Sequence, residues 1–206
     1  MQINKENLTI IIVTLKSDKV IHKCLKSIDP QIKKIVVENS SNEQFIKNLQ
    51  KKYDNLKCYL TGQNLGMGTG NNFGIKKAKT NFVMILNPDT ILNFDTLDKI
   101  FHISKNLDYA IISPISSDKN YPNYKKRGKF TQNLFNSDLL EVDQVDGFAM
   151  ILNKSKFEDS FFDEKIFMYL ENDDICYRMK KKKEKVFVYK QALINHLGAQ
   201  AVDDKF

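Results

Sequence analysis

The sequence predicts an α/β fold, in which a mostly parallel sheet carries helices on both faces. Through the first half of the chain, short β-branched runs alternate with amphipathic stretches, the pattern of strands linked by crossover helices. The run Phe82–Leu86 is continuously apolar, as expected of a central strand buried on both faces. The 206 residues are 42% hydrophobic and 28% charged, which is a globular composition. These observations exclude a disordered or repeat-based chain.

The spacing of apolar residues predicts each strand and helix of the first half in turn. Runs of β-branched residues predict strands, and apolar residues at spacings of three and four predict helices. The expected strands are Leu8–Thr14, Ile35–Val37, Leu56–Leu60, Asn81–Leu86 and Tyr109–Ser113. The expected helices are Val20–Ser27, Glu43–Lys52, Met67–Lys79 and Thr96–Lys105.

The second half breaks this alternation. Residues 116–140 are polar without a clear period, and we expect a loop there. Val145–Asn153 predicts a strand and Asn172–Lys183 a helix, and two short strands follow over 186–189 and 192–195. No linker separates the halves. We therefore expect one domain over residues 1–206 with an irregular C-terminal third.

The net charge of +7, from 32 basic and 25 acidic residues, fits an anionic partner as well as a lysine-rich sequence bias. No apolar run approaches the roughly 20 residues of a membrane-spanning helix, and the N-terminus lacks the order of a signal peptide. The three cysteines are far apart and form no CxxC pair, so a zinc knuckle or a disulfide framework is not supported. We expect a reducing cytoplasm.

Asn87 and Asp89 follow the apolar strand directly, around Pro88. Ligands of open parallel sheets collect at the carboxyl ends of the strands. Two oxygen-bearing side chains two residues apart suit a divalent metal that bridges phosphates. An ordinary Asn-Pro-Asp turn is the alternative interpretation.

Residues 64–74 read NLGMGTGNNFG and lead into a predicted helix. Backbone N–H groups at a helix start can approach an anion, and Asn71 and Asn72 add amides for a sugar or phosphate. The glycines are two apart, so the GxGxxG order of dinucleotide sites fails. A tightly packed helix start is the alternative.

Three carboxylates, Glu171, Asp173 and Asp174, lie within four residues at the start of a predicted helix. Such crowding raises at least one pKa, as a general base requires. Arg178 lies four residues after Asp174 and can pair with it. Ordinary helix capping by acidic residues is the alternative.

His196 stands near the end of a predicted strand, where it is either structural or a ligand for a borderline metal such as Mn²⁺. The run Lys180–Lys183 predicts a solvated helix face. Its functional alternative is contact with an anionic membrane or a lipid diphosphate.

In this order, the motifs resemble those of family 2 glycosyltransferases with the GT-A fold, in a pattern nearest to the rhamnosyltransferase-like branch. The resemblance spans roughly residues 8–200. It rests on the segments TIIIVTLKSD, VVENSSNE, NLGMGTGNNFGIKKA, LNPDT, VDGFAMILNKSKF, FFDEKIFMYLENDDICYR and INHLGAQ. Within these segments, Glu38 stands where aspartate is usual, and Asn87 takes the first position of the metal-binding DxD element, which is a common variant.

The resemblance implies an inverting transferase for a UDP- or dTDP-linked sugar, with residues 1–115 binding the donor and 116–206 carrying acceptor binding and catalysis. It implies that the base and ribose are lined by Thr14, Glu38 and Ser40. Asn71 and Asn72 would face the donor sugar or phosphates. The diphosphate would be held with Mn²⁺ or Mg²⁺ by Asp89 and His196, beside Asn87.

The family's catalytic base usually follows the glutamate that matches Glu171, but Asn172 occupies that position here. We therefore expect Asp173 to act as the base, with Glu171 as the second candidate. Asp174 is expected to pair with Arg178 and anchor the segment.

The implied acceptor is a glycan or lipid-linked glycan, as in polysaccharide and cell-envelope assembly. Peripheral contact with the cytoplasmic face of the inner membrane and a homo-oligomer are compatible with this setting. Because many relatives continue past the closing histidine element, acceptor binding is expected to use a partner, a membrane or a second copy. Two rivals remain: an inactive nucleotide-sugar-binding protein, and a nucleic-acid-binding domain motivated only by the charge.

Overall fold

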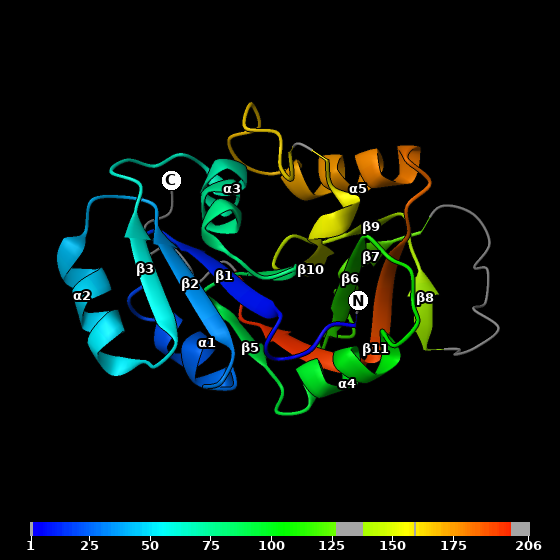
Figure 1. Cartoon of the computed structure of the whole chain (residues 1–206), viewed down its shortest axis with the longest axis horizontal. Coiled ribbons are helices and arrows are strands. Elements are labelled where there is room, and N and C mark those ends of the chain that lie inside the picture. The colour runs from blue at the N-terminus through cyan, green and yellow to red at the C-terminus, as the bar shows by residue number, and fades with distance from the viewer. Residues whose placement is uncertain (1, 127–137, 159, 199–206) are drawn as a thin grey trace.

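The computed structural model describes residues 2–126, 138–158 and 160–198. Within them, a nine-stranded sheet has the order β3-β2-β1-β4-β10-β6-β11-β5, with β8 also paired to β11 (Figure 1). Its strands are β1 (Leu8–Thr14), β2 (Lys33–Glu38), β3 (Leu56–Leu60), β4 (Phe82–Leu86), β5 (Thr90–Leu92), β6 (Ile111–Ser116), β8 (Leu139–Glu141), β10 (Ala149–Asn153) and β11 (Val186–His196). A separate ribbon pairs β7 (Tyr124–Lys125) with β9 (Gln144–Val145).

Strand direction confirms the mostly parallel sheet. Strands β3, β2, β1 and β4 are mutually parallel. Strand β10 is antiparallel to both β4 and β6, and β11 runs parallel to β6. Strands β5 and β8 are antiparallel to β11. Six strands (β1, β2, β3, β4, β6 and β11) therefore point one way, so their carboxyl ends share one edge of the sheet.

Helices cover both faces because β1 alternates its side chains between two cores. Ile10 and Ile12 pack into the core that α1 (Ile21–Ser27), α2 (Glu43–Lys52) and α4 (Thr96–Ile103) cover. On the opposite face, Ile11 and Val13 pack with α3 (Met67–Lys77) and α5 (Glu171–Lys181). Figure 1 shows the same separation, with α3 and α5 above the sheet and α1 and α4 below it.

Helix α3 lies unusually close to β1 and β2. A Cβ at Gly74 would come 2.5 Å from Ile11 Cγ2 and 3.2 Å from Val37 Cγ2. A Cβ at Gly70 would come 3.0 Å from Val13 Cγ1. Glycines on one face of the helix therefore permit its close approach, which brings the start of α3 to the carboxyl end of β1.

Several predicted elements need correction. The single strand expected over 145–153 is two, because β9 pairs with β7 while β10 enters the main sheet. The two short strands expected over 186–189 and 192–195 are one, because β11 continues through a register shift between Tyr189 and Leu193. Strand β5 was not expected.

The loop expected over 116–140 also changes. It contains β7 and the start of β8, while its residues 127–137 lie outside the described part of the chain. A short 3₁₀ helix over Lys154–Lys156 follows β10.

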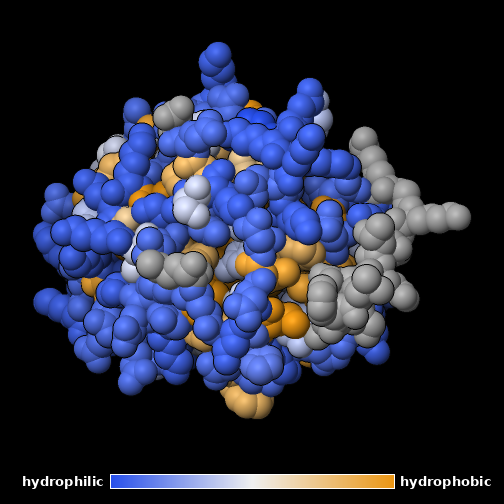
Figure 2. Space-filling model, turned by 45° about the vertical axis from the view of Figure 1, so that its right-hand side comes forward, coloured by the Kyte–Doolittle hydropathy of each residue, from blue (hydrophilic) through white to orange (hydrophobic). Residues whose placement is uncertain are grey.

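Hydrophilic side chains cover most of the face shown in Figure 2, and hydrophobic ones appear in the gaps between them. Among the described residues, no helix is both long enough and apolar enough to cross a membrane.

Candidate active site

Polar side chains gather where β1 and β2 end. Thr14 and Glu38 are the last residues of these strands and pair in register. The Glu38 carboxylate accepts a 2.6 Å hydrogen bond from Thr14 Oγ1 on one oxygen and another of 2.6 Å from Ser40 Oγ on the other. Its side chain is buried. Glu38 therefore orients the hydroxyls of Thr14 and Ser40, and its expected role in lining the base and ribose stays a prediction.

A cavity of about 90 Å³ opens above this edge, lined in part by Thr14, Asn39, Gly66, Asn87 and Met168. Sequence reasoning missed Asn39. Its amide donates 2.9 Å to Asn64 Oδ1 and 3.2 Å to the Gly66 carbonyl, and it accepts from Leu65 N at 3.0 Å. Asn39 thus fixes the loop that leads into α3. Its position directly after β2, at the carboxyl edge of the sheet, could have identified Asn39 as a candidate from the sequence.

Gly66 joins this loop to the second half of the chain. Its φ of 79° and ψ of 173° belong to a region that essentially only glycine adopts. Met67 N donates to the Phe167 carbonyl at 3.0 Å, and a Cβ on Gly66 would overlap that same carbonyl oxygen. Because Met168 lines the cavity, the segment after Phe167 forms part of its wall.

Asp89 and His196, distant in sequence, meet at this edge. His196 ends β11 opposite Thr90 of β5, and its ring stacks on Phe148 with centroids 4.2 Å apart. His196 Nε2 lies 3.4 Å from Asp89 Oδ1. The Asp89 side chain is only 2% exposed, and its Oδ1 has no hydrogen-bond donor among the described residues.

This pair has the chemistry of a partial metal site. A carboxylate oxygen without a donor beside an imidazole nitrogen suits Mn²⁺, and Mg²⁺ less well because it prefers oxygen ligands. Among the described residues, no three His, Cys, Asp or Glu side chains are grouped to hold a metal. The two residues fit a cation that takes its other ligands from a phosphate or water.

The carboxylates of α5 have separate partners. Asp174 Oδ2 accepts from Arg178 Nε at 2.8 Å, as the spacing predicts. Asp173 Oδ1 accepts from two amides, Asn172 Nδ2 at 2.9 Å and Gln144 Nε2. Burial raises the pKa of the Glu171 carboxyl, and its Oε2 has no hydrogen-bond partner in the described chain. The crowding expected from the sequence is present, but Asp173 and Asp174 are already hydrogen-bonded.

Asp146, between β9 and β10, is a carboxylate that sequence reasoning missed. Burial raises its pKa above the ordinary value, and the Tyr121 hydroxyl hydrogen-bonds it. The nearby charges of Lys125, Asp173 and His196 also act on it. Its position directly after a strand and before a glycine could have identified Asp146 as a candidate from the sequence.

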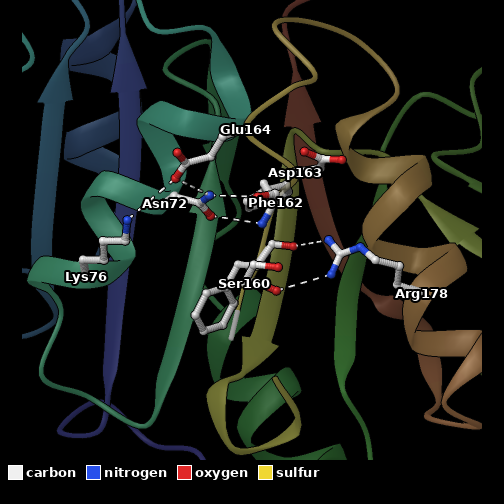
Figure 3. A pocket seen from close by; sticks show the side chains of 8 residues that line it. Asn72, Lys76, Ser160, Phe162, Asp163, Glu164 and Arg178 are labelled. Carbon is white, nitrogen blue, oxygen red and sulfur yellow. Dashed lines mark hydrogen bonds and ion pairs between the residues drawn. The ribbon is translucent and has the colours of Figure 1, made fainter. Parts of the chain in front are cut away.

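The two asparagines of α3 differ. Asn72 donates 2.8 Å to the Phe162 carbonyl and 3.1 Å to Glu164 Oε1, and it accepts from Phe162 N at 3.0 Å. Figure 3 shows these contacts in a cavity of about 410 Å³ between α3 and α5, with Lys76 at one end and Arg178 at the other. Asn72 thus anchors the second half of the chain and does not line the cavity above β1. Asn71 is buried, and its Oδ1 has no partner in the described residues.

Arg178 holds the segment before α5 from the other side (Figure 3). Besides Asp174, its guanidinium donates to the carbonyls of Ser160, at 3.3 Å, and Phe161.

Replacing Arg178 by alanine is expected to lower the free energy of unfolding by about 2 kcal/mol, because a charged donor with several acceptors is lost. Urea unfolding measures this. Lys181→Ala, which removes an exposed cation over the Tyr177 ring, is the control, and an equal loss in both variants would contradict the anchoring role.

The fold and this edge define a class. Solved glycosyltransferases with the GT-A fold share this mostly parallel sheet and its covering helices. One is S. aureus TarS 1–349 in complex with UDP-GlcNAc, with a TM-score of 0.67 and 19% identity, covering 97% of this chain and 62% of that one. Another is the mannosyltransferase PcManGT from Pyrobaculum calidifontis in complex with GDP-Man and Mn²⁺. It has a TM-score of 0.70 and 11% identity, covering 92% of this chain and 56% of that one.

Sequence comparison gives the family. The family model of glycosyl transferase family 2 matches residues 9–170. The chain therefore belongs to glycosyl transferase family 2 and is a transferase. It is 27% identical over 215 residues to the low-salt glycan biosynthesis hexosyltransferase Agl10 of Haloferax volcanii, covering 96% of this chain and 69% of that protein. It spans only 36% of the longer TarS chain.

Proposed function

We propose that this glycosyltransferase is an inverting enzyme that moves a sugar from a UDP- or dTDP-linked donor to a glycan or lipid-linked glycan. The observation that carries the proposal is the 3.4 Å approach of His196 Nε2 to Asp89 Oδ1 beside the cavity that Thr14 and Asn87 line. The solved TarS 1–349 is in complex with UDP-GlcNAc, and PcManGT is in complex with GDP-Man and Mn²⁺, which supports a nucleotide-sugar donor and a divalent metal. The sequence resemblance to the rhamnosyltransferase-like branch remains a prediction.

In this proposal, residues 1–115 bind the donor. Thr14, Ser40 and Asn87 contact the nucleotide, and Asn71 Oδ1, which has no partner among the described residues, accepts from a donor hydroxyl. Asp89 and His196 would hold Mn²⁺ or Mg²⁺, which when bound neutralises the charge that develops on the departing diphosphate. The burial of Asp89 keeps its carboxylate away from bulk water and strengthens its interaction with a cation.

Residues 116–206 would carry acceptor binding and proton transfer. A carboxylate beside Asn172 takes the proton of the acceptor hydroxyl. From the sequence, Asp173 is the first candidate for this base and Glu171 the second, while Asp174 anchors α5 through Arg178. The acceptor hydroxyl reaches the anomeric carbon from the side opposite the diphosphate, which inverts its configuration.

We also propose a setting in the cytoplasm, at the inner face of the membrane, in polysaccharide assembly. Lys180–Lys183 are all exposed and suit an anionic lipid surface. The similarity to a glycan-biosynthesis hexosyltransferase supports a glycan or lipid-linked acceptor. A homo-oligomer is compatible with this arrangement.

The test is donor cleavage followed by NMR. The chain is mixed with UDP- and dTDP-sugars and Mn²⁺ without acceptor, and the anomeric configuration of the first released sugar is recorded. The proposal predicts the configuration opposite to that of the donor, and retention would contradict an inverting mechanism. Because Asn172 occupies the family's base position, a second candidate is an inactive nucleotide-sugar-binding protein, which predicts metal-dependent donor binding without cleavage.

A further inference from the structure

We propose that Asp146 is the catalytic base, taking the proton of the acceptor hydroxyl in place of a carboxylate at position 172. This inference rests on the proposed function. Asn172 contacts the chain on both sides of Asp146. Its Nδ2 donates to the Val145 carbonyl at 3.1 Å, and its Cβ would lie 3.3 Å from a Cβ on Gly147. Asp146 is therefore next to the position from which the resemblance predicts a base to act.

Asp146 is linked to both parts of the site. Phe148, two residues further along the chain, stacks on the His196 ring of the proposed metal pair with centroids 4.2 Å apart. The charges of Asp173 and His196, together with Tyr121 and Lys125 from the segment before β8, act on the Asp146 carboxyl. Asp146 is therefore near both the carboxylates of α5 and the metal pair, where an acceptor oxygen must approach a donor held at Asp89.

Two of the three carboxylates of α5 already have donors, whereas Glu171, whose Oε2 has no partner in the described chain, remains the competing candidate. Two amide donors share Asp173 Oδ1, and the Arg178 guanidinium holds Asp174. These donors compete with an acceptor hydroxyl for the same carboxylate oxygens. Asp146 instead receives one hydroxyl, from Tyr121, and burial raises its pKa. A raised pKa makes a carboxylate a stronger base.

The acceptor oxygen forms a bond to the anomeric carbon while the bond from that carbon to the diphosphate oxygen breaks. The bonding pair leaves with the diphosphate, and the acceptor proton passes to the Asp146 carboxylate. When water replaces the acceptor, the same transfer releases free sugar. Azide carries no proton, so its attack on the anomeric carbon needs no base.

That difference gives the test. Cleavage of UDP- and dTDP-sugars with Mn²⁺ is followed as nucleoside diphosphate release in water and in sodium azide, for wild type, Asp146→Ala and Asp146→Asn. We expect release in water to fall at least about 100-fold in both variants, the usual lower range for a lost general base. Azide should restore release by Asp146→Ala and yield glycosyl azide. The control is Asp143→Ala, in the same segment but paired with Lys180, which should match wild type.

The outcomes separate the two proposals. If wild type cleaves none of the donors, the proposed transferase activity fails and the role of Asp146 fails with it. If wild type cleaves a donor and both Asp146 variants cleave it at a similar rate, only the assignment of Asp146 is overturned. A loss that azide does not restore, in a variant still stabilised by nucleoside diphosphate and Mn²⁺, would also overturn it. The isosteric Asp146→Asn keeps the shape of the segment and provides the rate comparison if the alanine variant does not fold.

Discussion

Replacing Asp89 by asparagine is expected to abolish the Mn²⁺-dependent stabilisation of the chain by its nucleotide. The Asp89 carboxylate is buried and its Oδ1 has no hydrogen-bond donor in the described chain, so it is available to a cation. An amide keeps the shape but removes the charge that a divalent metal requires. At a ligand concentration of one hundred times Kd, wild type should gain about 2.7 kcal/mol. Asp89→Asn should gain almost none, measured as the shift in unfolding midpoint.

A matched aspartate controls for the loss of charge alone. Asp95 pairs with Lys99 at 2.8 Å on the side of α4, away from the cavity lining. Asp95→Asn should keep the full nucleotide-dependent shift. An Asp89→Asn variant that folds and retains the same Mn²⁺-dependent shift would contradict the role of Asp89.

Replacing Gly66 by alanine is expected to weaken donor binding by about tenfold or more, equivalent to at least about 1.4 kcal/mol. The added Cβ would overlap the Phe167 carbonyl and displace the segment whose Met168 lines the cavity. The positive φ at this position adds a strain cost of its own, of order 1–3 kcal/mol. Calorimetric titration with nucleoside diphosphate and Mn²⁺ measures the affinity.

Gly62 provides the matched control, because its φ of 81° is close to the 79° of Gly66 but a Cβ there would meet nothing within 4 Å. Gly62→Ala should lose some stability through φ strain and keep its donor affinity. Equal affinities in the two variants would show that the contact with Phe167 does not shape the donor cavity.

Local periodicity predicted much of the fold. The bounds of β1, α2 and β3 are those expected, because each has a period that its own residues determine. The position of β10 between β4 and β6 was not readable, since antiparallel insertion depends on contacts far apart in sequence. The register shift in β11 is likewise set by its neighbour β6, and the sequence showed it only as an interruption between two strands.

The site was predicted in part. Asp89 and His196 come together because β11 pairs with β5. The two motifs suggested that these residues share a site, but the strand pairing that joins them was not readable from the sequence. Asn72 was expected to face the donor, and its amide contacts Phe162. Local sequence patterns do not reveal which distant segment packs against that side of α3. Asp146 follows a two-residue strand, and its Asp-Gly sequence resembles an ordinary turn.

Thermal-shift titration of the intact chain with UDP, dTDP, GDP and CDP, each with Mn²⁺ and with EDTA, tests the central claim most directly. The claim is that the carboxyl edge of β1, β2 and β4 binds a nucleotide through a metal. It predicts that one nucleotide, UDP or dTDP, raises the unfolding midpoint with Mn²⁺ and that EDTA removes the shift. No shift with any nucleotide in the presence of Mn²⁺ would contradict a nucleotide-sugar site at this edge.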